Sequence, residues 1–220
     1  MRILQNTLLA SLFILLINPQ VLANNNISQL KTIAETADLV RPLLNGQKIP
    51  ADVLVTTSEG KELTLGKFLN NKKTVLFFYR GGWCPFCNTQ MGQLKKIEKQ
   101  LTNLGFQLIG ISTDNVEDLQ KSIGDNQLNY QLLSDFNSVT SQAFGLAFFS
   151  SQKVTDRYLA KMKLENPLQK NKAGDERLVL PVPAIYVIDS DGLVQFNYVN
   201  PNFKVRLHES LLLKAAELVK

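Results

Sequence analysis

A short apolar run, a double glycine and two closely spaced cysteines constrain this 220-residue chain more than any other feature. Val75–Tyr79 is apolar and aromatic, as expected of a buried strand. Gly81–Gly82 permits a tight turn. Pro85 favours the first position of a helix, which places Cys84 near the N-cap and Cys87 in the first turn. The sequence therefore predicts a strand, a turn and a helix, with both cysteines where the helix begins.

This placement favours redox chemistry at the cysteine pair. Unpaired N–H groups and the positive end of the helix dipole stabilise a thiolate and lower its pKa. A structural disulfide that closes so short a loop would gain little loop entropy. A zinc site needs about four ligands, whereas the chain offers Cys84, Cys87 and the distant His208. A CxxC beside a strand–helix pattern thus predicts a redox disulfide and no metal site.

The first residues are typical of a targeting segment. Arg2 forms a minimal positive region, Ile3–Ile17 is mostly apolar, and Val21–Ala23 has the small-residue pattern of a cleavage site. We expect residues 1–23 to be a cleaved signal peptide that leaves no stable membrane anchor. The alternatives are an uncleaved anchor or a buried helix. An exported CxxC protein would lie in a periplasm or be secreted, where disulfides persist.

Composition excludes several classes of function. The chain has 24 basic and 19 acidic residues, a net charge of +5, and no basic block interleaved with aromatic residues. We therefore expect no nucleic-acid partner. There is also no glycine-rich phosphate-binding fingerprint, so no nucleotide or flavin cofactor is predicted.

Alternating strand and helix patterns predict one α/β domain over residues 46–220, after an N-terminal junction and helix in residues 24–45. The predicted helix covers Ile27–Leu44. The strands and helices expected after it are, in order, strand 49–56, turn 58–61, strand 62–65, short helix 65–69, strand 75–79, helix 85–104, strand 106–112, helix 114–123 capped by Asp114, strand 130–133, helix 137–144, strand hairpin 184–198 and helix 207–219. Residues 148–180 break the pattern, and we interpret them as an insertion with one helix around Val154–Leu164. This insertion is either a plain surface excursion or a lid or partner surface.

From about Val40 onward the chain resembles the thioredoxin superfamily, and within it the peroxiredoxin-like branch of alkyl hydroperoxide reductases and thiol-specific antioxidant proteins. The segments that carry this resemblance are Phe77–Cys87 and Val182–Asp189. The resemblance implies an α/β, thioredoxin-like three-layer sandwich, in which helices flank a central mixed β-sheet.

The resemblance places Cys87 at the position of the peroxidatic cysteine. In peroxiredoxins a threonine lies three residues earlier and a proline seven residues earlier, where this chain has Cys84 and Arg80. Peroxiredoxins also carry an arginine just before the strand that here begins at Ala184, and this chain has Pro183 there. Thioredoxins have a cis-proline at that point. The layout is thus similar to peroxiredoxins, and the site residues depart toward thioredoxin.

Two mechanisms follow from the resemblance. In a peroxidase, Cys87 would reduce hydrogen peroxide or an organic hydroperoxide, Cys84 would resolve the sulfenic acid, and a thioredoxin-like partner would reduce the disulfide. Arg80 would assist as the nearest cation, unless it is a structural strand-end arginine.

In a thiol–disulfide oxidoreductase, Cys84 would instead attack a protein disulfide and Cys87 would resolve the mixed disulfide. Trp83 would flank that site, or serve only in packing, and a cis-Pro183 would shape the groove for the partner. A third hypothesis is a binding or scaffold domain whose redox site is no longer active. We favour the first hypothesis, the peroxidase, which is an exported thiol-based antioxidant oxidoreductase.

Overall fold

The computed structural model describes residues 30–219, so the expected signal peptide lies outside the described residues. Among the helices of that range, none is long and apolar enough to cross a membrane. In chain order the elements are η2 (Ala37–Leu39), β1 (Leu54–Thr57), β2 (Glu62–Thr64), α1 (Leu65–Leu69), β3 (Thr74–Phe78), α2 (Pro85–Asn103), β4 (Gln107–Ser112), α3 (Val116–Asn126), β5 (Gln131–Ser134), α4 (Val139–Ala143), β6 (Ala147–Phe149), α5 (Gln152–Met162), β7 (Gln169–Lys170), β8 (Glu176–Arg177), β9 (Val179–Pro181), β10 (Ala184–Ile188), β11 (Val194–Val199) and α6 (Glu209–Leu218).

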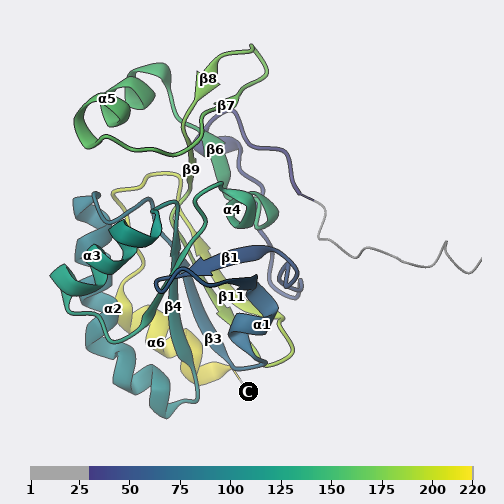
Figure 1. Cartoon of the computed structure of the whole chain (residues 1–220). Coiled ribbons are helices and arrows are strands. Elements are labelled where there is room, and N and C mark those ends of the chain that lie inside the picture. Colours follow the sequence, from purple (N-terminus) through teal and green to yellow (C-terminus); the bar gives the residue numbers. More distant parts are fainter. Residues whose placement is uncertain (1–29, 220) are drawn as a thin grey trace, which may run out of the picture.

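Seven strands form one mixed sheet in the order β11-β10-β3-β4-β5-β1-β2. β3, β4 and β5 are parallel, whereas β10, β11, β1 and β2 pair antiparallel with their neighbours. Helices lie on both sides of this sheet (Figure 1). The α/β, thioredoxin-like three-layer sandwich expected from the sequence is therefore confirmed.

The central strand β3 distributes the hydrophobic core between the two faces of the sheet. Its side chains alternate, as the pleat of a strand requires. Val75 and Phe77 pack into the core beneath α2, α3 and α6, and Leu76 and Phe78 pack into the core beneath α1 and α4. All four residues are fully buried. The run Val75–Tyr79 was thus predictable as a strand because both of its faces are covered.

The N-terminal helix predicted over Ile27–Leu44 is wrong in its described part. Residues 30–44 have no regular secondary structure apart from the single turn η2 and an isolated bridge at Ala34. Their backbone groups bond to the segment around α4 and β6, with Ala34 N–H donating to the Ala147 carbonyl and Arg41 N–H to the Gly145 carbonyl, each at 3.0 Å. Leu30, which is part of the apolar spacing that predicted the helix, is 45% exposed, so this spacing does not form a buried helical stripe.

The insertion contains more structure than the one helix expected from its sequence. That helix is present as α5, and a β7–β8 hairpin follows it. β6 and β9 pair antiparallel at the base of the insertion, from Ala147 with Pro181 to Phe149 with Val179. Figure 1 shows α5 and the hairpin beyond one end of the main sheet, at the end where α2 begins. The insertion is therefore placed next to the cysteine pair.

Candidate active site

The double glycine forms the turn that joins β3 to α2. Gly81 has a φ of +145°, and a Cβ atom added there would overlap the Trp83 indole nitrogen. The Cys84 N–H donates to the Gly81 carbonyl at 3.1 Å, which closes the turn. The Gly82 N–H donates to the Asp114 Oδ2 at 2.8 Å. Only glycine fits at position 81, because both the backbone angle and the space exclude a side chain.

Asp114 does not cap the following helix, as its sequence position suggested. Asn115 is the N-cap of α3, and its Oδ1 accepts a hydrogen bond from the Asp118 N–H at 2.8 Å. Asp114 lies one residue too early and is buried, which raises the pKa of its carboxyl group to about 6. Its carboxylate accepts hydrogen bonds from Gly82 N–H and Ser112 Oγ instead. The residue therefore fixes the cysteine turn from the neighbouring strand.

The cysteines lie where the sequence predicted them. Cys84 is the N-cap of α2 and Pro85 is its first residue. The Cys87 N–H donates to the Cys84 carbonyl at 2.9 Å, so both residues belong to one turn. Both are free thiols in this structure, and they are only 1% and 0% exposed. The dithiol is therefore closed to solvent.

The two sulfurs differ in their affinity for a proton. A hydrogen bond from Cys87 lowers the pKa of Cys84 to about 6, with further help from the Arg80 and Arg206 charges. Burial raises the pKa of Cys87 well above its ordinary value, and the hydrogen bond and charge of Cys84 add to that rise. The reduced pair therefore favours the negative charge on Cys84 and the proton on Cys87.

Arg206, which the sequence analysis did not single out, contacts the inner cysteine. Its Nη2 lies 3.4 Å from Cys87 Sγ. Within the described part of the chain, its Nε and Nη1 atoms are buried without a hydrogen-bond partner. Arg206 precedes α6 and is 119 residues from Cys87 in sequence. No spacing rule could have paired them, because the contact depends on how the chain returns after β11.

Arg80, the cation expected near the site, lies inside a group of aromatic rings. Its guanidinium carbon is 4.1 Å from the Phe203 ring centroid, 5.2 Å from Trp83 and 5.5 Å from Tyr158. Its Nη2 donates to the Tyr158 hydroxyl at 2.6 Å. Cation–π contacts stabilise a desolvated guanidinium in such a position. Arg80 is thus a buried charge beside Cys84, held by residues from three segments of the chain.

Pro183 lies at the start of β10, where Ala184 pairs with Phe78 at the end of β3. It is buried, and its carbonyl accepts a hydrogen bond from the Asn200 N–H at 3.3 Å. No peptide bond among residues 30–219 is cis. The prediction of a cis bond at Pro183, made by analogy with thioredoxins, is therefore wrong, although the residue lies at the expected end of the sheet.

A cavity of about 320 Å³ adjoins the site on the side of α3 and the end of α5. Gly82 and Trp83, which precede Cys84, line it together with Met162 and Leu164, and neither cysteine is among its lining residues. Its remaining lining is largely polar and charged: Asn88, Asp114, Asp118, Lys121, Ser122, Asp125 and Asn126. In the described part of the chain, no cluster of three His, Cys, Asp or Glu side chains is arranged to hold a metal ion.

Comparison with protein families identifies the family of the chain. The model of the AhpC/TSA family matches residues 45–197. A Bcp-type peroxiredoxin of Haemophilus influenzae is 34% identical over 107 residues, which cover 49% of this chain and 68% of that protein. A second Bcp-type relative, from Coxiella burnetii, is 29% identical over 163 residues and covers 74% of this chain and 91% of its own.

Solved structures agree on the fold. Peroxidoxin BcpB from Mycobacterium tuberculosis superposes with a TM-score of 0.60 at 21% identity, covering 80% of this chain and 97% of that one. Reduced Prx3 from Vibrio vulnificus, solved with hydrogen peroxide, gives a TM-score of 0.63 at 16% identity, with 80% and 97% covered. With the family model matching most of its length, the chain belongs to the AhpC/TSA family and is an oxidoreductase of the peroxiredoxin type.

Proposed function

We propose that the chain reduces hydroperoxides with the Cys84–Cys87 pair, which alternates between a dithiol and a disulfide. Membership of the AhpC/TSA family supports the reaction class. The observation that carries the proposal is the 3.4 Å contact between Arg206 Nη2 and Cys87 Sγ. A guanidinium at that distance stabilises a thiolate, which is the form of sulfur that attacks a peroxide.

Arg206 also has the means to bind the substrate. The peroxiredoxin threonine and arginine positions hold Cys84 and Pro183 in this chain. The unpartnered Nε and Nη1 groups of Arg206 are buried donors, and a buried donor without a partner costs free energy until an acceptor arrives. A peroxide oxygen is such an acceptor. Arg206 would thus supply, from a different segment, the cation that Pro183 cannot.

The proton held by the pair decides which sulfur reacts. Moving it from Cys87 to Cys84, across their hydrogen bond, creates a Cys87 thiolate beside Arg206. This sulfur attacks one peroxide oxygen, so that an S–O bond forms while the O–O bond breaks and two electrons pass from sulfur to the peroxide. The leaving oxide takes the Cys84 proton and departs as water or an alcohol.

Cys84, now a thiolate, completes the oxidative half of the cycle. It attacks the Cys87 sulfenic acid, the S–S bond forms, and the hydroxide that leaves takes a proton from solvent to become water. A thioredoxin-like dithiol would then reduce the disulfide. No large rearrangement is needed to bring the sulfurs together, because both lie in the first turn of one helix.

A second candidate function is exchange with protein disulfides, favoured by one specific observation. The pKa of Cys84 is lowered to about 6, so this sulfur is a thiolate at neutral pH before any substrate binds. In that reaction Cys84 would attack the partner and Cys87 would resolve the mixed disulfide. Burial of Cys84, at 1% exposed, opposes it because a protein partner must reach the sulfur directly.

Stopped-flow oxidation by hydrogen peroxide, with Cys84→Ser and Cys87→Ser alongside, tests the peroxidase. We expect the reduced wild-type protein to react far faster than a free thiol. Cys87→Ser should lose this reaction, and Cys84→Ser should retain it but stop at a trappable sulfenic acid. A wild-type rate equal to that of a free thiol, with Cys84-dependent reduction of insulin disulfides, would establish exchange instead.

Export remains part of the proposal and rests on the sequence of residues 1–23 alone. Expression of the full chain in a bacterium, followed by fractionation and mass measurement, tests it. Export with cleavage predicts a protein in the periplasm or medium that begins at Asn24. An intact chain retained in the cytoplasm would contradict it.

A further inference from the structure

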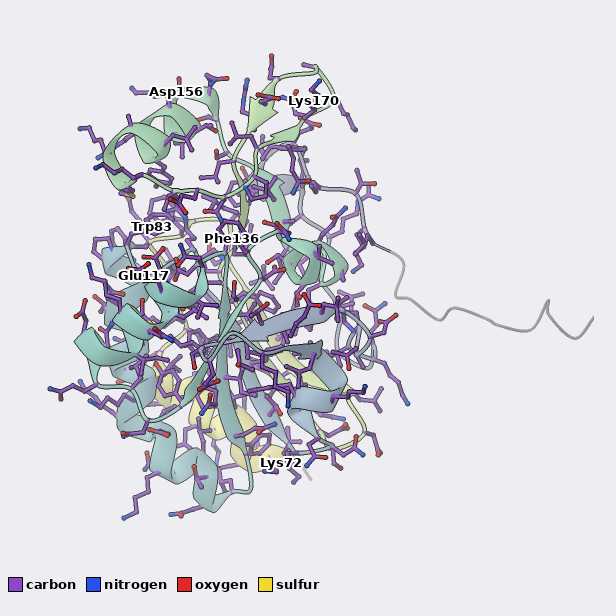
Figure 2. All side chains as sticks on the ribbon, in the orientation of Figure 1. Lys72, Trp83, Glu117, Phe136, Asp156 and Lys170 are labelled. Carbon is purple, nitrogen blue, oxygen red and sulfur yellow. The ribbon has the colours of Figure 1, made fainter. Side chains whose placement is uncertain are left out.

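The insertion contributes a side chain to the redox site. Tyr158, in α5, accepts a hydrogen bond from Arg80 Nη2 at 2.6 Å. Its ring lies 4.7 Å from the Trp83 ring, centroid to centroid. Figure 2 shows Trp83 beneath α5, between the insertion and the start of α2. The residue next to Cys84 is therefore covered by a segment that lies outside the main sheet.

The rest of α5 is held to the molecule by few contacts. Thr155 is the one buried residue of the helix, and its hydroxyl bonds Ser150 Oγ and the Leu178 N–H within the insertion itself. After the helix, Asn166 Nδ2 donates to the Thr113 carbonyl at 2.6 Å. A segment with so few buried contacts opens at low free-energy cost. The Arg80–Tyr158 contact is thus a principal link between α5 and the site.

The closed arrangement leaves neither cysteine open to solvent, since both are buried beneath the residues that α5 covers. The neighbouring cavity of about 320 Å³ is lined by Gly82 and Trp83 but by neither cysteine, so it adjoins the sulfurs without reaching them. Most of the other side chains that line this cavity are polar or charged. Such an approach suits hydrogen peroxide or another small polar hydroperoxide better than a bulky apolar one or a folded protein.

We propose that α5 is a cover that limits the redox site to small polar hydroperoxides, and that Tyr158 is the positioning residue that holds this cover and Arg80 in place. The inference rests on the proposed peroxidase function for its substrate class. The cover itself is defined by contacts that exist whichever reaction the cysteines perform. Access to Cys84 can therefore be measured without any peroxide.

Alkylation of the reduced protein by a small and a bulky reagent tests the cover directly. We compare iodoacetamide with fluorescein maleimide on wild type, on Tyr158→Ala and on Lys161→Ala, an exposed position of the same helix. Loss of a hydrogen bond to a charged group should raise the bulky-to-small rate ratio of Tyr158→Ala by about tenfold or more. Lys161→Ala should leave the ratio unchanged. An unchanged ratio in a folded Tyr158→Ala protein would overturn the proposal.

Tyr158→Phe separates positioning from mere packing. It keeps the ring and removes the hydroxyl that holds Arg80, so the pH midpoint of Cys84 alkylation should rise while the unfolding temperature stays close to that of wild type. An unchanged midpoint would overturn the positioning role, even if Tyr158→Ala fails to fold.

Peroxide kinetics then define the substrate class. The preference for hydrogen peroxide over cumene hydroperoxide should fall in Tyr158→Ala by the same factor as the alkylation ratio. If no hydroperoxide reacts faster with wild type than with a free thiol, the peroxidase proposal fails, and the alkylation ratio still decides whether α5 is a cover. A preference for the bulky peroxide in wild type would overturn the size limit.

Discussion

Two regions of the molecule meet at the cysteine pair, and they are encoded in different ways. The first is local, residues 79–88, where strand, glycine turn and helix start follow one another along the chain. The second is assembled from distant segments, with Tyr158 from the insertion and Phe203 and Arg206 from the loop before α6. The first region supplies the sulfurs, and the second supplies Arg206 beside Cys87 and the Tyr158 and Phe203 rings beside Arg80.

The two regions also differ in the sulfur that they contact, although the Arg206 charge lowers the pKa of Cys84 as well. The local turn creates the hydrogen bond between the cysteines that lowers the pKa of Cys84. The distant loop places a guanidinium on Cys87. A CxxC sequence alone thus describes the half of the site that resembles thioredoxin, and the return of the chain adds the cation on which the proposed reaction with peroxide depends. The predictions below test the two regions separately.

The largest effect is expected when the local turn is broken. Gly81→Ala introduces a side chain at a φ of +145° that overlaps the Trp83 indole nitrogen and approaches Asp114 Oδ1 to 2.6 Å. Strain and overpacking together should lower the free energy of unfolding by about 3 kcal/mol or more. Denaturant unfolding measures this loss.

Gly92→Ala is the matched control for that substitution. It lies within α2, and a Cβ there meets no atom within 4 Å. Because glycine is unfavourable inside a helix, this change should stabilise the protein by about 0.5–1 kcal/mol. Equal effects of the two substitutions would show that the turn is not constrained as described.

A smaller effect is expected when the distant region is disturbed. Arg206→Gln removes the charge at Cys87, and loss of one charge-assisted interaction corresponds to about 10- to 100-fold in rate. The rate constant for oxidation by hydrogen peroxide should fall by that factor, whereas iodoacetamide should still alkylate Cys84. Arg206→Lys should recover part of the rate, since it restores the charge without the guanidinium fork.

Lys204→Gln controls for the loss of a positive charge from the same loop, because Lys204 is exposed. It should leave the peroxide rate within about twofold of wild type. If the peroxide rate of Arg206→Gln equals that of Lys204→Gln, the contact with Cys87 has no part in the reaction. The two regions would then not have the separate roles described above.

The smallest effect concerns the reactivity of Cys84 at neutral pH. A pKa of about 6 makes nearly all of this thiol a thiolate at pH 7, a gain of about 30-fold over an ordinary cysteine. Intrinsic nucleophilicity falls about tenfold over the same range of pKa, so the net gain is only a few-fold.

The pH profile is more informative than the rate. Because the thiolate is the reacting form, iodoacetamide alkylation should rise as the pH increases through about 6 and then level off. In Cys87→Ser a hydroxyl replaces the thiol donor. The pH profile of this variant reports how much Cys87 contributes to the lowered pKa of Cys84. A wild-type midpoint near the ordinary cysteine value would refute the proposed charge on Cys84.

The sequence predicted the local region closely because its determinants are short-range. Pro85 fixes the helix start, Gly81 fixes the turn, and Val75–Tyr79 is apolar throughout, so each signal lies within a few residues of the structure it specifies. Periodicity also predicted α2 and β4 to within one residue at each end.

Tertiary contacts account for what was not predicted. Asp114 was mistaken for a helix cap because acidic residues favour that position, whereas its carboxylate bonds the Gly82 N–H 32 residues away. Residues 30–44, which we call the N-terminal strap, were predicted to be helical because their apolar spacing fits both a helix and an irregular segment. Neither Arg206 nor Tyr158 could be identified as a site residue from the sequence, since single arginines and tyrosines occur in many surface helices and loops.

That strap has a consequence for the order in which the protein can be built. Ala34 and Arg41 are synthesised among the first residues of the domain, yet their backbone partners are Ala147 and Gly145, more than 100 residues later. Pairings so distant along the chain form slowly, because the intervening loop must close first. The start of the domain therefore stays unpaired until two thirds of the chain has emerged from the ribosome. Its docking against β6 then completes the base of the insertion.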